Sequence, residues 1–150
     1  MRTLLLVGLV MVLVGGVAAA QSNEVIDDIL EQDAATFGQA AYIVLLGAGE
    51  APEDASVEEV YGSISWSDWN LEQKSMDEAV TLGELSYLVM ESFGISGGIM
   101  YRIVPGPRYA ARELDYLDFF IGSGSPYRTV SGQEMLHVMG QALDFAEEGA

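Results

Sequence analysis

The chain has 150 residues, 50% of them apolar, and carries a formal net charge of −17 with no cysteine. This acidity argues against nucleic acid and anionic lipid surfaces as general partners, and the lack of cysteine excludes disulfides and a lipid-bearing N-terminal cysteine. Residues 21–150 are enough for one domain with a sizeable core, so we expect a single domain held together by that core alone.

Residues 1–20 have the composition of a secretion signal. Arg2 supplies the positive start, residues 4–14 form an apolar stretch, and Ala18 and Ala20 fit a small-residue cleavage site. The alternative is a membrane anchor, because the uncharged stretch is just long enough to span a bilayer. A double glycine within it and the small residues at its end favour cleavage before Gln21. We therefore expect a periplasmic or extracellular mature chain, residues 21–150, that does not span the membrane.

Three segments of the mature chain share one pattern: a threonine or serine, a glutamine or glutamate three residues later, then an apolar run at helical spacing. The pairs are Thr36 with Gln39, Thr81 with Glu84, and Ser131 with Glu134. In such a capping box each side chain bonds the backbone N–H of the other residue, which starts a helix. Repetition at a period of a few tens of residues indicates a repeat architecture. We expect a "boxed" helix to begin within two residues of each hydroxyl residue.

A connecting helix is expected before each boxed helix. The first covers residues 24–31, the second starts at a further capping box, Ser56 with Glu59, and the third begins at Pro107 and stops at Gly122. Residues 99–104 are predicted to be an extended loop, because a lone strand has no partner. The predicted fold class is all-α. The residues expected to be buried in one shared core are Leu85, Leu88, Val89, Leu114, Leu117, Val138 and Met139.

Residues 80–95 resemble the second helix of an S-layer homology repeat, which has an aliphatic residue, threonine, two further residues and glutamate before an apolar helix ending in glycine. Residues 114–126 resemble that family's first helix, glycine turn and proline. The resemblance implies three helix-pair repeats packed as one pseudo-threefold module, of the kind that docks exported proteins to envelope polysaccharide. In the family, an arginine after the threonine helps to grip anionic wall polymer. Here Phe37, Leu82 and Gly132 take that place, so the fold is expected without this grip, and the surface is lost or turned toward another protein.

Four of the five basic residues of the mature chain lie within residues 102–128, interleaved with tyrosines. Guanidinium groups bind carboxylates and phosphates in a bidentate way, and tyrosines add flat rings and hydroxyls. This stretch is the candidate site for an anionic glycan or a peptide carboxylate. The alternative is that each arginine pairs locally with Glu113, Asp115 or Asp118. The candidate ligand-binding residues are Arg102, Arg108, Arg112, Arg128, Tyr101 and Tyr109.

Two apolar groups are candidates for a partner surface. Trp66 and Trp69 lie three apart in a polar loop, where they either cover the core or face a partner. Ile99 and Met100 belong to the apolar segment of the predicted linker, which would be the contact of an assembly if it is exposed.

The sequence carries no catalytic signature. His137 is the one histidine and there is no cysteine, which excludes a zinc site and a Cys–His nucleophile. We expect no metal and no cofactor. The function expected is an exported, non-enzymatic, envelope-associated module that binds anionic cell-wall glycan or an envelope protein. The alternatives are a structural subunit of a periplasmic assembly, and a small glycan-processing enzyme that uses Glu84 with Asp115 or Asp118 as its two acids.

Overall fold

The computed structural model describes residues 25–65, 69, 71 and 74–149, and within these residues it contains helices and two isolated β-bridges but no strand. The expected all-α class is confirmed. The first 20 residues, predicted to be a signal peptide, lie outside the described residues. After helical residues 25–30 come α2 (Phe37–Gly47), α3 (Val57–Ser63), α4 (Leu82–Ser92), α5 (Ile99–Ile103), α6 (Pro107–Tyr116) and α7 (Gly132–Gly149).

The capping residues begin the helices where the sequence predicts. α2 and α4 start directly after Thr36 and Thr81, and both capping boxes are complete. The Thr81 hydroxyl accepts from the Glu84 N–H at 3.3 Å, and the Glu84 carboxylate accepts from the Thr81 N–H at 2.8 Å. α3 starts with a complete box as well. At α7 only half of the box forms: the Ser131 hydroxyl accepts from the Glu134 N–H at 3.2 Å.

Helix α6 is shorter than predicted. It ends at Tyr116 rather than near Gly122, because Asp118 takes a left-handed conformation with φ of 59° that a helix cannot continue. The turn carries Phe119 into the core, where it is 2% exposed. Leu117 is left 37% exposed, so the prediction that it is buried was wrong.

Residues 99–104 are not the extended loop that the sequence predicts. Residues 99–103 form the short helix α5, with Gly98 as its N-cap. The Arg102 N–H donates to the Gly98 carbonyl at 3.1 Å and the Val104 N–H donates to the Met100 carbonyl at 3.0 Å. A helical turn satisfies these backbone groups locally, which a strand without a partner could not do.

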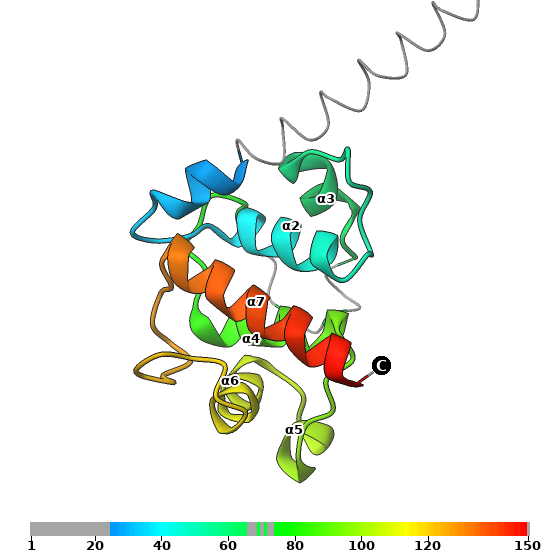
Figure 1. Ribbon diagram of the computed structural model, residues 1–150, viewed down its shortest axis with the longest axis vertical. Coiled ribbons are helices and arrows are strands. Elements are labelled where there is room, and N and C mark those ends of the chain that lie inside the picture. The colour runs from blue at the N-terminus through cyan, green and yellow to red at the C-terminus, as the bar shows by residue number, and fades with distance from the viewer. Residues whose placement is uncertain (1–24, 66–68, 70, 72–73, 150) are drawn as a thin grey trace, which may run out of the picture.

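The core lies around α4, which contacts α2, α6 and α7. Figure 1 shows α7 passing in front of α4, with α2 above and α6 below. The remaining residues expected in the core are buried with at most 4% exposure: Leu85, Leu88, Val89, Leu114, Val138 and Met139. The prediction of a shared core is therefore confirmed for all of its members except Leu117. No helix within the described residues combines the length and apolar character that a membrane span requires.

A closed ring of backbone hydrogen bonds joins the three residues that precede the boxed helices. The Ala35 N–H donates to the Val130 carbonyl at 2.8 Å, the Val80 N–H to the Ala35 carbonyl at 2.9 Å, and the Val130 N–H to the Val80 carbonyl at 3.3 Å. All three residues have 0% exposure. Their backbone groups cannot reach water, so the ring satisfies what burial would otherwise leave unpaired.

The first N–H group of each boxed helix extends this ring. Phe37 donates to the Glu78 carbonyl at 2.7 Å, Leu82 to the Arg128 carbonyl at 2.8 Å, and Gly132 to the Gln32 carbonyl at 3.0 Å. In each case the acceptor lies three or four residues before the capping residue of the next boxed helix in the cycle. Helix N-termini lack intrahelical partners for these donors, so the three helix starts satisfy one another.

Candidate functional site

Helix α6 separates its residues into a buried face and a charged outer face. Ala110, Ala111 and Leu114 are buried, and α6 packs against α4. Arg108 and Arg112, four residues apart and therefore on one side of the helix, are exposed. Pro107 occupies the first turn, where its missing N–H costs nothing. The helix thus holds two arginines outward from the core.

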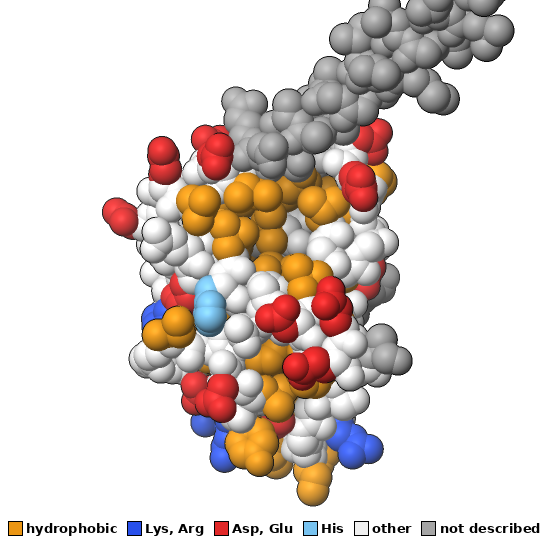
Figure 2. Space-filling model, viewed as in Figure 1, with side chains coloured by type: hydrophobic (Ala, Val, Ile, Leu, Met, Phe, Trp, Pro, Cys, Tyr) orange, Lys and Arg blue, Asp and Glu red, His pale blue; other side chains and the backbone are white. Residues whose placement is uncertain are grey.

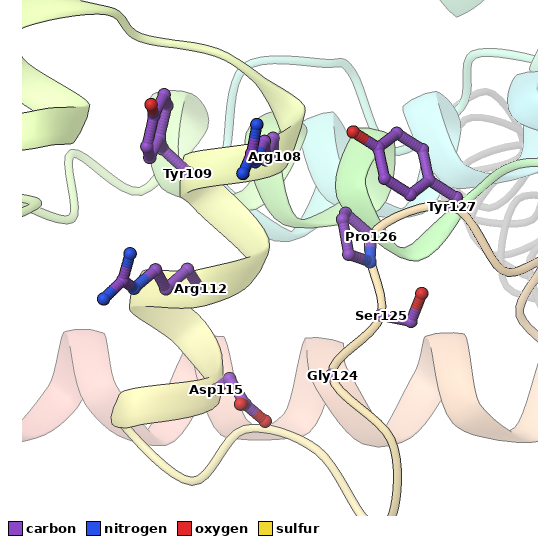
Figure 3. A pocket seen from close by; sticks show the side chains of 8 residues that line it. All are labelled: Arg108, Tyr109, Arg112, Asp115, Gly124, Ser125, Pro126 and Tyr127. Atoms are coloured by element: carbon purple, nitrogen blue, oxygen red, sulfur yellow. The ribbon is translucent and has the colours of Figure 1, made fainter.

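A cleft of about 490 Å³, here called the α6 cleft, lies between this outer face and the loop that leads toward α7. Figure 3 shows the loop residues along one side of the cleft and the α6 residues along the other. Asp115 closes the lower end in this view, and its carboxyl carbon lies 2.5 Å from where a β-carbon would stand on Gly124. The lining residues are Arg108, Tyr109, Arg112, Asp115, Gly124, Ser125, Pro126 and Tyr127.

The arginines of the α6 cleft do not form the local ion pairs that the sequence leaves open. Within the described part of the chain, the ion pairs join Lys74 to Glu84 and Arg128 to Glu134. The Arg108 guanidinium lies 5.8 Å from the centre of the Tyr109 ring, which is a cation–π contact. The cleft therefore presents guanidinium groups without a carboxylate paired to them, in a protein with a large excess of acids.

Arg128 does not join them. Its guanidinium makes two hydrogen bonds to the Glu134 carboxylate, one of them 2.7 Å long, and its Nε donates to the Ser123 carbonyl at 2.7 Å. The hydrogen bonds to Glu134 raise the pKa of the Arg128 guanidinium above its usual value. These contacts fasten the loop of residues 123–128 to α7, so Arg128 supports the wall of the α6 cleft without lining it.

Arg102 and Tyr101 lie at a second cleft, of about 360 Å³, next to α5. Tyr101 is only 7% exposed, and its hydroxyl donates to the Glu91 carboxylate at 2.5 Å. Burial and the contact with Glu91 raise the pKa of the Tyr101 hydroxyl far above its usual range. Tyr101 therefore fastens α5 to α4, and Arg102 remains exposed beside it.

The two predicted partner surfaces differ. Ile99 is 73% exposed and Met100 is 49% exposed, so the apolar segment does face solvent. Trp69 is partly buried and packs against the core, so of the two interpretations of the tryptophans it follows the one in which they cover the core. Trp66 lies outside the described residues.

The acids considered for a glycan-processing enzyme lie in three settings, and Asp115 is the one that lines the α6 cleft. Glu84 accepts from Thr81 and forms the ion pair with Lys74 at 3.0 Å, and Asp118 is exposed in the turn after α6. Among the described residues, no group of three histidines, cysteines or acids is placed to hold a metal ion. The sequence did not predict that residues 124–126 line the α6 cleft, because they have the composition of an ordinary turn. Tyr127 is the one residue of that loop whose type is typical of a binding site.

Comparison with models of protein families, with curated proteins and with solved structures found no match for this chain.

Proposed function

We propose that the chain is an exported, non-enzymatic binding module of the cell envelope, and that its α6 cleft binds an anionic group of a cell-wall glycan. The observation that carries the proposal is the pair Arg108 and Arg112, which line one cleft without a carboxylate partner among the described residues. The chain has a formal charge of −17, so carboxylates that could pair with an arginine are abundant. Because Arg108 and Arg112 nevertheless form no ion pair with a described residue, their arrangement favours an anionic ligand as their partner.

The chemistry of the α6 cleft fits a sugar that carries a carboxylate or a phosphate. Each guanidinium offers a planar fork of donors that such groups accept in a bidentate way. Tyr109 and Tyr127 add ring faces that sugar C–H groups can cover, with hydroxyls for hydrogen bonds. Asp115 at the other end disfavours a second negative charge there and accepts from a sugar hydroxyl. The ligand that fits best therefore has one anionic group beside neutral hydroxyls.

We further propose that the module consists of three helix pairs with pseudo-threefold symmetry. The ring of bonds among Ala35, Val80 and Val130 supports this arrangement, because equivalent positions of the three segments bond in one cyclic order. The capping residues support the same arrangement, because the hydroxyls of Thr36, Thr81 and Ser131 each accept from the backbone N–H three residues later. Export through residues 1–20 is tested directly by N-terminal sequencing of protein recovered outside the cytoplasm, which is expected to begin at Gln21.

The binding test uses the mature protein and isolated cell-wall sacculi. Replacing Arg108 and Arg112 by glutamine removes the charges and is expected to weaken binding by about tenfold, which corresponds to roughly 1.4 kcal/mol. Arg102→Gln is the control, because it removes one positive charge from a different cleft, and each single variant, Arg108→Gln or Arg112→Gln, is compared with it. Binding of the parent is expected to weaken as salt is raised. Equal binding by the double variant and the control would contradict the proposal.

A second candidate function, that of a subunit in a protein assembly, is favoured by one separate observation: the apolar side chains of α5 face solvent. It uses none of the residues of the α6 cleft.

A further inference from the structure

The α5 end of the molecule carries an exposed apolar surface, here called the α5 tip. Its residues and their exposed fractions are Ile99 at 73%, Met100 at 49%, Ile103 at 68% and Val104 at 53%. Three of these large apolar side chains belong to a helix of five residues and the fourth is its C-cap, and exposed apolar patches of this kind mark sites of interaction. Arg102, exposed in the same helix, gives the α5 tip a positive charge.

The opposite end of the molecule carries a complementary hollow, here called the α3 cleft. Figure 1 places α3 and α5 at opposite ends of the helical body. The α3 cleft measures about 430 Å³, has apolar residues from α2, α3 and the intervening loop, and has acids at its rim. The apolar residues are Leu45, Ala51, Pro52, Ala55 and Val60, and the acids are Glu50, Asp54 and Glu59.

Arg102 at the α5 tip and the three acids of the α3 cleft carry charges of opposite sign. Figure 2 shows most of the Lys and Arg atoms of this face at the lower end, beside apolar atoms, and acidic atoms around the upper end as well as across the middle and lower parts of the face. Glu50 and Asp54 are exposed, and no ion pair joins either of them to a described residue. The α5 tip thus offers exposed apolar side chains with one arginine, and the α3 cleft offers an apolar hollow lined by three acids.

We propose that the protein associates head to tail with further copies of itself, the α5 tip of one copy entering the α3 cleft of the next. In this contact the Ile99 and Ile103 side chains leave water for an apolar hollow, and Arg102 approaches Glu50 and Asp54 of the neighbouring copy. Because the contact joins two different surfaces at opposite ends, it does not close at a dimer but continues into a chain or a ring. The contact goes beyond the proposed glycan binding and leaves the α6 cleft free.

Net charge sets the conditions for this association. Copies that each carry a formal charge of −17 repel one another, and this repulsion acts over long distances only at low salt. At about 0.15 M salt the Debye length is roughly 8 Å. The repulsion between acids that lie far from the contact is then screened, while the attraction between Arg102 and the nearby acids of the next copy is screened much less. Association is therefore expected at physiological ionic strength and is expected to weaken in dilute buffer.

The test pairs two variants that each destroy one end. Ile99→Ser with Ile103→Ser removes the apolar α5 tip, and Glu50→Lys with Asp54→Lys reverses the rim of the α3 cleft. These side chains are exposed, so the thermal midpoint of each variant is expected to match the parent. Leu143→Ser, which changes an apolar residue 42% exposed on α7, is the matched control.

Sedimentation equilibrium in about 0.15 M salt is the measurement. The parent and Leu143→Ser are expected to gain mass with concentration beyond a dimer, and each end variant alone is expected to stay monomeric. An equimolar mixture of the two end variants restores one intact α5 tip and one intact α3 cleft, and is expected to form a species of about twice the monomer mass that does not grow further.

Several outcomes would overturn the inference. A parent that stays monomeric at every concentration excludes association between copies. A parent that stops at a dimer, or a mixture of end variants that stays monomeric, excludes the head-to-tail contact. Loss of binding to phosphatidylcholine vesicles in the α5 tip variant, with the parent monomeric, would assign the tip to a lipid surface instead. Sacculus binding by monomeric protein is expected to be the same for the α5 tip variant, whose net charge is unchanged, as for the parent, which separates this test from that of the proposed glycan site.

Discussion

Two glycines of α7 predict opposite responses to the same substitution. A β-carbon added at Gly132 would stand 2.5 Å from the carbonyl carbon of Ile29 and closer still to its oxygen, both of them backbone atoms. Gly140 lies in the middle of the same helix, on its exposed side, and a β-carbon added there would meet nothing within 4 Å. Helix propensity alone favours alanine at both positions.

The magnitudes follow from these surroundings. At Gly132 the start of α7 must move away from Ile29, which overpacks the neighbourhood at a cost of about 1–3 kcal/mol. The movement also weakens the 3.0 Å bond from the Gly132 N–H to the Gln32 carbonyl, a further cost of about 1 kcal/mol. Gly132→Ala is therefore expected to destabilise the protein by about 2–4 kcal/mol. Gly140→Ala is expected to stabilise it by roughly 0.5–1 kcal/mol, because the unfolded chain loses freedom and nothing clashes.

Urea and thermal unfolding, followed by circular dichroism, would measure both variants beside the parent. Gly132→Ala is expected to lower the thermal midpoint by on the order of 10 °C, and Gly140→Ala is expected to raise it slightly. If Gly132→Ala melts at or above the parent, residues 25–30 do not lie against the start of α7 and the reasoning fails. If Gly140→Ala is strongly destabilising, the outer face of α7 is covered by something in solution.

Three further predictions concern the core, a cap and a tyrosine. Leu88→Ala, at a position with 0% exposure, is expected to cost about 2–5 kcal/mol of unfolding free energy, and a cost below about 1 kcal/mol would contradict its burial. Thr81→Ala frees the Glu84 N–H and is expected to cost roughly 1 kcal/mol, so an unchanged thermal midpoint would show that Thr81 is not the cap. Because the pKa of folded Tyr101 is raised, the unfolded state ionises first, and stability is expected to fall as pH rises past about 10. The urea unfolding midpoint is measured at about pH 8 and pH 10.5, and Tyr101→Phe is expected to lose less of its midpoint between these pH values than the parent does. Near neutrality the variant is expected to be less stable, because it lacks the hydrogen bond to Glu91. An unchanged pH dependence would show that Tyr101 ionises equally in the folded and unfolded states.

The candidate site shows how far sequence patterns reach. The grouping of arginines and tyrosines in residues 101–128 is visible in the sequence, and so is the helical spacing that places Arg108 and Arg112 on one side of α6. The separation of Arg128 from this pair is not visible, because its partner Glu134 also belongs to a capping pattern that predicts a different bond. Two local patterns compete for the Glu134 carboxylate, and only the path of residues 123–128 shows that the guanidinium receives it.

The starts of α2, α3, α4 and α7 followed from the sequence by itself, since a cap joins residues three apart and depends on little else. The apolar stripes of α4 and α7 followed for the same reason, because helical period alone decides which side chains share a face. Only the tertiary structure decided the ring among Ala35, Val80 and Val130, the length of α6, the helical form of α5 and the positions of the α5 tip and the α3 cleft at opposite ends of the molecule. Each of these depends on which buried backbone group finds a partner, or which side chain finds room, across segments far apart in the chain, and such contacts leave no spacing in the sequence.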